Sequence, residues 1–187
     1  MKNLLLLALT IVCLASSCGD DDSGESLRLD GDNVSAPLLD PDTYQAAVRF
    51  SSTLTTPYSG FKLTEVDYYI LDAPGSCKII IYDEAATGTG PGDILFTSPD
   101  LTGRINGADW NTYTLPTPIE LSGDDLWIAV EVDHPSSLRT VGCDAGPAQS
   151  NGDWVLASTV GQWQTLRDFT SDAVSINWNI RGILSED

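Results

Sequence analysis

Short runs of alternating apolar and polar residues follow one another from residue 44 to the end of the chain, separated by turns rich in glycine, proline and aspartate. Alternation with a period of two is typical of a β-strand that buries one face. In the clearest run, 125–133, one face is formed by Leu126, Ile128, Val130 and Val132. No long stretch shows the 3.6-residue apolar period of an ordinary helix. The pattern therefore predicts an all-β chain.

Further β-branched and aromatic runs cover residues 44–50, 61–71, 77–84, 93–98, 110–115, 118–121, 154–159, 163–166 and 174–184. In the run 61–71 we expect the core-facing positions to be Leu63, Val66 and Tyr68. Roughly nine strands at this spacing predict a two-sheet antiparallel β-sandwich. A jelly-roll-like topology is favoured over an immunoglobulin one, because long loops such as 140–152 separate some strands. One sandwich domain is expected over residues 41–187.

The amino terminus has the layout of a secretion signal. Lys2 precedes an apolar stretch, Leu4 to Ala15, that is shorter than the roughly 20 residues needed to span a bilayer. The sequence LASSC that follows resembles a bacterial lipobox, in which the cysteine is acylated and becomes the new amino terminus. We therefore expect residues 1–17 to be a lipoprotein signal peptide and Cys18 to carry the lipid anchor.

Residues 18–40 are polar and rich in aspartate, serine and glycine, which predicts an acidic flexible tether. Adjacent like charges repel one another and keep such a segment extended in water. The stretch GDDDSGE resembles the acidic tethers of Bacteroidetes lipoproteins, which are associated with export to the cell surface. The expected location is the outer membrane, with display at the cell surface through the Cys18 lipid anchor.

The charge of the chain limits which molecules it can bind. The chain of 187 residues has 9 basic and 27 acidic residues, for a formal net charge of −18. Such a chain lacks the basic patch that binding to nucleic acid requires. Carboxylates could instead bind a cation, although acidic charge also serves solubility.

The order of several short motifs resembles the β-sandwich modules of secreted and surface proteins in Bacteroidetes, which are often found beside adhesin or protease domains. The motifs are AAVRF, YSGFKLTEVDYYI, IIIYDE, WNTYTLPTPIEL, LWIAVEV, GCDAGP, GQWQTL and INWNIRGIL. The resemblance implies a jelly-roll-like sandwich with a role in attachment or binding. It implies no catalytic residues.

Cys77 and Cys143 are the two cysteines expected in the mature domain. Both lie beside turns, and compartments beyond the inner membrane permit disulfides, so we predict a bridge between them. The alternative is two separate buried thiols.

Catalysis has one candidate constellation, in which Cys143 would be a nucleophile with His134 as its base and Asp133 or Asp144 as the orienting group. No local signature of a cysteine hydrolase surrounds Cys143, and a lone histidine at a strand end is usually solvated. We therefore expect no enzymatic activity.

The segment GCDAGP predicts a tight turn in which Asp144 accepts hydrogen bonds from turn amides. A weaker hypothesis is a calcium site formed by Asp144, Asp133 and loop carbonyls; no other cofactor is expected. Among the tryptophans, Trp127 is either an exposed platform or the second side of a covered strand, and Trp163 follows a turn.

The predicted function is a non-catalytic surface lipoprotein that binds a glycan or a protein. The expected binding residues are Asp133, Asp144 and Trp163, which combine carboxylates, a fixed turn and an aromatic face. One alternative is a structural or assembly subunit of a surface complex. A second is a hydrolase or a protease accessory.

Overall fold

The computed structural model describes residues 25–85 and 90–186, so the predicted signal peptide, Cys18 and the first part of the predicted tether lie outside the described residues. Strands make up 45% of the structure and helices 9%, which confirms the all-β prediction. The strands are β1 (Ser26–Leu27), β2 (Asp42–Phe50), β3 (Lys62–Ile70), β4 (Ser76–Tyr82), β5 (Ile94–Thr97), β6 (Asp109–Glu120), β7 (Leu126–His134), β8 (Trp154–Ala157), β9 (Trp163–Thr165) and β10 (Ile180–Ser185).

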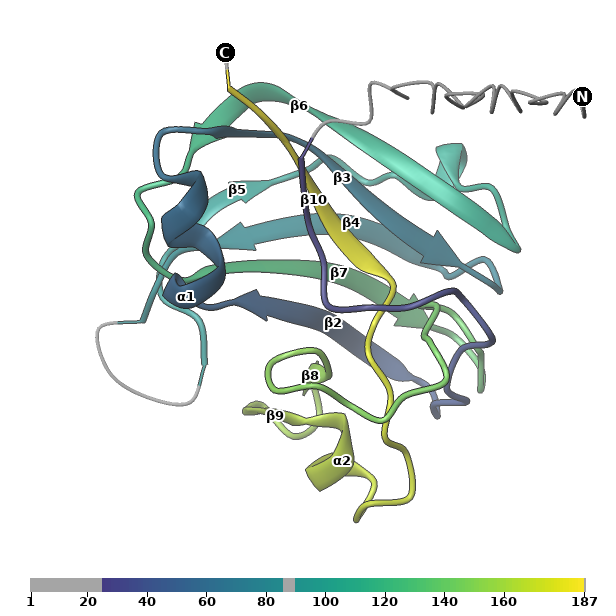
Figure 1. The fold of residues 1–187 in the computed structure, drawn as a ribbon. Helices are drawn as coiled ribbons and strands as arrows, with labels where there is room; N and C mark the ends of the chain where they lie inside the picture. The colour runs from purple at the N-terminus through teal and green to yellow at the C-terminus, as the bar shows by residue number, and fades with distance from the viewer. Residues whose placement is uncertain (1–24, 86–89, 187) are drawn as a thin grey trace, which may run out of the picture.

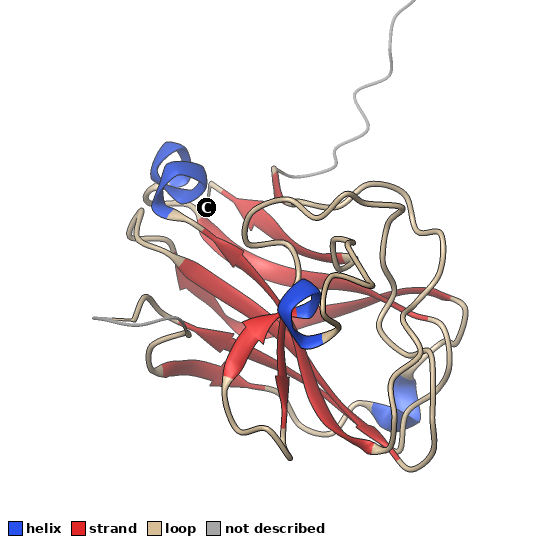
Figure 2. Cartoon of the chain, turned by 90° about the horizontal axis from the view of Figure 1, so that it is seen from below, coloured by secondary structure: helices blue, strands red, loops and turns tan. Residues whose placement is uncertain are grey.

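The helical elements are short and lie in the connections between strands (Figure 2). They are α1 (Ser52–Thr55), the 3₁₀ helices η1 (Thr56–Tyr58) and η2 (Thr102–Arg104), and α2 (Leu166–Phe169). Over the described ranges, none of these helices has the length and apolar character needed to cross a membrane.

Two antiparallel sheets stack on one another (Figure 1). One sheet has the strand order β1-β10-β3-β6, and the other has the order β5-β4-β7-β2-β8-β9. When β8 and β9 are set aside, the remaining eight strands cross between the sheets in the order of a jelly roll. The hairpin β8–β9 is inserted before the last strand and widens the second sheet. The predicted jelly-roll-like sandwich is therefore confirmed.

The space between the sheets holds the main core. The four predicted residues of β7 are buried, each at 4% exposure or less, as the alternation predicted. Leu63, Val66 and Tyr68 of β3 are also buried. The three-residue step from Leu63 to Val66 breaks strict alternation, and it coincides with a register shift between Leu63 and Glu65. A bulge of this kind returns the following residues to the same face.

Some strand bounds differ from the sequence-based prediction. The runs 110–115 and 118–121 form the single strand β6, which contains Pro116 and Pro118. Proline is tolerated there because β6 lies at the edge of its sheet, where one side of the backbone needs no partner. The run 174–184 becomes a ladder only from Ile180, although Trp178 forms an isolated bridge with Cys143.

The prediction of a flexible tether as far as residue 40 is wrong for residues 25–40. Strand β1 pairs with β10, and isolated bridges join Ser35 to Cys143 and Leu39 to Leu138. Leu27 and Ala36 are buried, at 3% and 1% exposure. The folded domain therefore includes residues that were assigned to the tether.

Polar side chains hold this segment in place. The carboxylate of Asp30, whose side chain is fully buried, accepts hydrogen bonds from Arg181 Nη2 at 2.8 Å, Arg181 Nε at 3.0 Å and Asn179 Nδ2 at 2.7 Å. Asn33 Nδ2 donates to Asn179 Oδ1 at 2.8 Å. The polar composition predicted a solvated tether, but these polar groups form hydrogen bonds with one another inside the domain.

We predict that Asp30→Asn lowers the free energy of unfolding by about 2–4 kcal/mol, because it leaves the Arg181 guanidinium without its buried counter-charge. Urea unfolding measures the change. Limited proteolysis should also show faster cleavage within residues 25–40. The matched control is Asp32→Asn at an exposed position, with an expected change within about 0.5 kcal/mol. Equal stability of the two variants would contradict the conclusion that the Asp30 carboxylate holds residues 25–40 in the folded domain.

Candidate functional site

The outer side of the six-stranded sheet has a cluster of aromatic rings, which we call the aromatic face: Tyr82, Trp127, Trp154 and Trp163. The ring centroids of Trp127 and Trp154 are 5.0 Å apart, and those of Trp127 and Trp163 are 5.7 Å apart. Trp127 is 1% exposed and forms the floor, whereas Trp154 and Trp163 are half-buried. Of the two alternatives for Trp127, the second side of a covered strand is therefore correct.

Small residues make room for these rings. Ala47 of β2 and Ala129 of β7 are cross-strand partners, and both have no exposed surface. Gly90 contributes from the loop between β4 and β5, since a Cβ there would lie 2.9 Å from Cδ1 of Trp163. The absence of a side chain at Gly90 lets the backbone lie against the indole.

A row of polar side chains borders the aromatic face. Tyr82 Oη donates to Gln45 Oε1 at 2.7 Å, and Gln45 Nε2 donates to Glu131 Oε2 at 3.0 Å. Lys78 Nζ lies 3.4 Å from Glu131 Oε1 and completes the row. Half-buried indoles beside amide, carboxylate and ammonium groups can contact the faces of sugar rings, while those polar groups form hydrogen bonds with the sugar hydroxyls.

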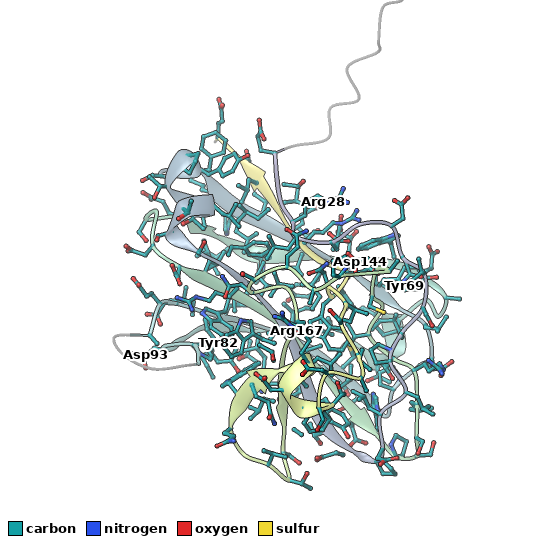
Figure 3. The ribbon with its side chains drawn as sticks, turned by 60° about the horizontal axis from the view of Figure 1, so that its bottom comes forward. Arg28, Tyr69, Tyr82, Asp93, Asp144 and Arg167 are labelled. Carbon is teal, nitrogen blue, oxygen red and sulfur yellow. The ribbon has the colours of Figure 1, made fainter. Side chains whose placement is uncertain are left out.

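The three predicted binding residues do not form one site. Trp163 belongs to the aromatic face, and Asp133 lies on the same side of β7 as Trp127 but six residues away. Six residues of a strand span about 20 Å. Asp144 is buried and bonds to Gly31 and Asn177, neither of which belongs to the aromatic face, and it lies away from Tyr82 in Figure 3. The predicted grouping is therefore wrong.

Asp144 is a structural residue in this fold. Its Oδ1 accepts from the backbone N–H groups of Gly146 and Asn177, both at 2.8 Å. Its Oδ2 accepts from Gly31 N at 3.0 Å and from Asn177 Nδ2 at 2.9 Å. Burial raises the pKa of the carboxyl, but these hydrogen bonds outweigh burial and lower the pKa below its ordinary value.

The predicted turn at GCDAGP is confirmed by the Gly146 contact with Asp144, whereas the predicted calcium ligands are not assembled. The four N–H donors occupy the accepting positions of the Asp144 carboxylate. Asp133 accepts a hydrogen bond from Thr43 Oγ1 at 3.3 Å in a separate part of the domain. Within residues 25–85 and 90–186, no group of three or more histidine, cysteine, aspartate or glutamate side chains could hold a metal ion.

The predicted disulfide is absent, because Cys77 and Cys143 are both free thiols in the core. Cys77 belongs to β4 of the six-stranded sheet, whereas Cys143 lies outside the named strands and forms isolated bridges with Ser35 and Trp178. Burial raises the pKa of Cys77 to about 12 and that of Cys143 to about 11. Both thiols are therefore protonated near neutral pH, and neither has the low pKa of an activated nucleophile.

His134 is buried at 3% exposure, so the prediction of a solvated histidine is wrong. The inward alternation of β7 continues through its last residue, and the ring of Tyr44 lies 5.1 Å from that of His134. Burial lowers the pKa of His134, and the opposing effects of the Leu39 backbone and nearby aspartates are smaller. Those aspartates are Asp133, Asp42 and Asp72.

Sequence reasoning identified two members of the aromatic face, Trp127 and Trp163, but it missed Tyr82 and Trp154. A signal was present in β7, where Trp127 and Ala129 are apolar on the side opposite the core-facing residues. A strand that is apolar on both sides is covered on both sides. Comparison with known proteins adds no relative: no family profile, curated protein or solved structure matches the chain.

We predict that the folded chain loses stability as the pH falls from 7.5 to 5.5, in part through His134. The ordinary pKa of histidine is near 6.5. Because the pKa is lower in the folded chain, the unfolded chain binds more protons in this range, and the free energy of unfolding falls with pH. Urea unfolding of wild type and His134→Phe at both pH values measures the effect. Between pH 7.5 and pH 5.5, the free energy of unfolding should decrease less for His134→Phe than for wild type. An equal decrease in both proteins would contradict the prediction.

Proposed function

We propose that the chain is a non-catalytic lipoprotein of the outer membrane that binds a glycan at the cell surface through its aromatic face. The observation that carries the proposal is the pair of half-buried indoles, Trp154 and Trp163, above the buried floor of Trp127. Aromatic side chains offer a large contact area at little cost in conformational entropy. The row from Gln45 to Lys78 adds donors and acceptors for hydroxyl groups.

The geometry of the face suits a chain of sugars better than a small buried molecule. The indoles lie on the outside of a sheet, and the polar row runs across neighbouring strands β4, β7 and β2. A ligand there would lie across the strands, contact the rings with its flat faces and reach the polar row with its edges.

The state of the candidate catalytic residues supports a binding role. The raised pKa of Cys143 disfavours the thiolate that a cysteine nucleophile needs. Asp144, a candidate orienting group, has its carboxylate bound to backbone and side-chain N–H groups of the fold. His134 is enclosed in the core.

A glycan array followed by titration calorimetry tests the binding site. Wild type should bind at least one glycan class, and Trp163→Ala should weaken that binding about tenfold, the equivalent of about 1.4 kcal/mol. The control is Trp110→Ala, which removes a half-buried tryptophan from the outer side of the other sheet. Circular dichroism confirms that each variant is folded at the titration temperature. Absence of array binding, or equal weakening by both variants, would refute the proposed site.

Lipid anchoring is tested separately by metabolic labelling with an alkyne fatty acid. The wild-type chain should be labelled, and Cys18→Ala should lose the label because it lacks the thiol that is acylated. Cys13→Ala is the control, since residue 13 lies in the apolar part of the predicted signal and is removed with it. Label that persists in Cys18→Ala would show that Cys18 is not the anchor.

A further inference from the structure

A cleft of about 410 Å³ opens where the edges of the two sheets meet. One wall is β5, the edge strand of the six-stranded sheet, and the other is the end of β6 with the turn into β7. The ring contact between Phe96 of β5 and Tyr113 of β6, at 5.9 Å, shows that the two edges are close. The volume lies in the range of pockets that bind ligands.

The lining of the cleft combines apolar and acidic residues. The apolar residues are Leu95, Ile119, Leu121 and Leu126. The acidic residues are Asp83, Glu84, Glu120, Asp124 and Asp125, and none of the lining residues is basic. Asp125 is bound to Arg49 and to the backbone N–H of Ser52. In the described part of the chain, Asp125 is the only one of the five with an ion pair.

Strand β5 has an edge open to pairing. It pairs with β4 on one side, and among the described residues no strand pairs with its other side. Ile94 and Leu95 are 59% and 48% exposed, although edge strands are commonly protected by lysine, proline or a covering segment. An edge with exposed apolar residues favours the addition of an extended peptide.

The charge identifies the kind of peptide. A second copy of this chain is a poor occupant, because each copy has a net charge of −18. The segment GDDDSG at residues 19–24 is also acidic and would be repelled by the carboxylates. The complementary occupant is an extended segment in which basic side chains alternate with apolar ones.

We infer that the cleft docks such a basic, apolar strand from a partner protein, which adds to the free edge of β5. Its apolar side chains pack against Leu95 and Ile119, and its lysine or arginine side chains face Glu84, Glu120 and Asp124. Main-chain hydrogen bonds to β5 provide affinity that does not depend on the sequence of the peptide, and the side chains of the peptide provide specificity. The residues that line the cleft do not include any member of the aromatic face, and the inference does not depend on glycan binding.

The probe for the test is a synthetic peptide of alternating lysine and valine, and the comparison peptide alternates lysine and serine. The full chain is reconstituted in nanodiscs of zwitterionic lipid, and empty nanodiscs give the blank. The lysine–valine peptide should bind at least tenfold more tightly by calorimetry. Hydrogen–deuterium exchange should show slower exchange of the β5 amides when it is bound.

Variants distinguish docking from general attraction to an acidic protein. Glu84→Gln with Glu120→Gln should weaken binding about fivefold, as expected for charge contacts from two exposed carboxylates. The matched control changes two exposed acids elsewhere, Asp32→Asn with Asp172→Asn, and should change binding less than twofold. Trp163→Ala should also leave peptide binding unchanged. The inference is overturned by equal binding of the two peptides, equal weakening by the two double variants, or unchanged exchange at β5.

Discussion

Two buried carboxylates, those of Asp30 and Asp144, hold the segment between β1 and β2 against the rest of the sandwich, because few backbone hydrogen bonds do so. The first strand of the jelly roll is only two residues long, and the chain between it and β2 makes only isolated bridges. Asp30 binds Arg181 and Asn179, and Asp144 binds Gly31 and the segment at residue 177. A buried charge is stable only while its donors remain in place. These side chains therefore perform the role that a longer first strand would have.

The main sheets could be predicted from the sequence because their pattern is local. The alternation in β7 defines which residues face the core, and the uneven step in β3 is resolved by one bulge. That residues 25–40 belong to the folded domain could not be predicted in this way. Asp30 becomes a core residue only because Arg181 lies beside it, and the two are separated by most of the chain. Composition describes such a segment as polar, but it does not show whether water or protein satisfies the polar groups.

The same distinction applies to the candidate sites. Trp163 was identified because a tryptophan after a turn is conspicuous, but its neighbours come from other strands and depend on register. Asp144 was correctly assigned to a turn, but its further donors, Gly31 and Asn177, come from distant segments and could not be predicted from the local sequence. Both cysteines lie near turns in the sequence, yet the fold places Cys77 in β4 and Cys143 in a segment that forms only isolated bridges. Pairings between distant segments decided each of these outcomes.

The short first strand also has a mechanical consequence. Tension applied to the chain ahead of Glu25 would enter the domain through β1, where two residues pair with β10 and Leu184 N donates to Glu25 O at 2.7 Å. Once these few bonds open, the load falls on the ion pair between Asp30 and Arg181. The sheets behind it have longer ladders and would be reached later. Under force, the first sixteen described residues can thus act as a releasable length of chain, extending the reach of the domain before the longer ladders of the two sheets are disturbed.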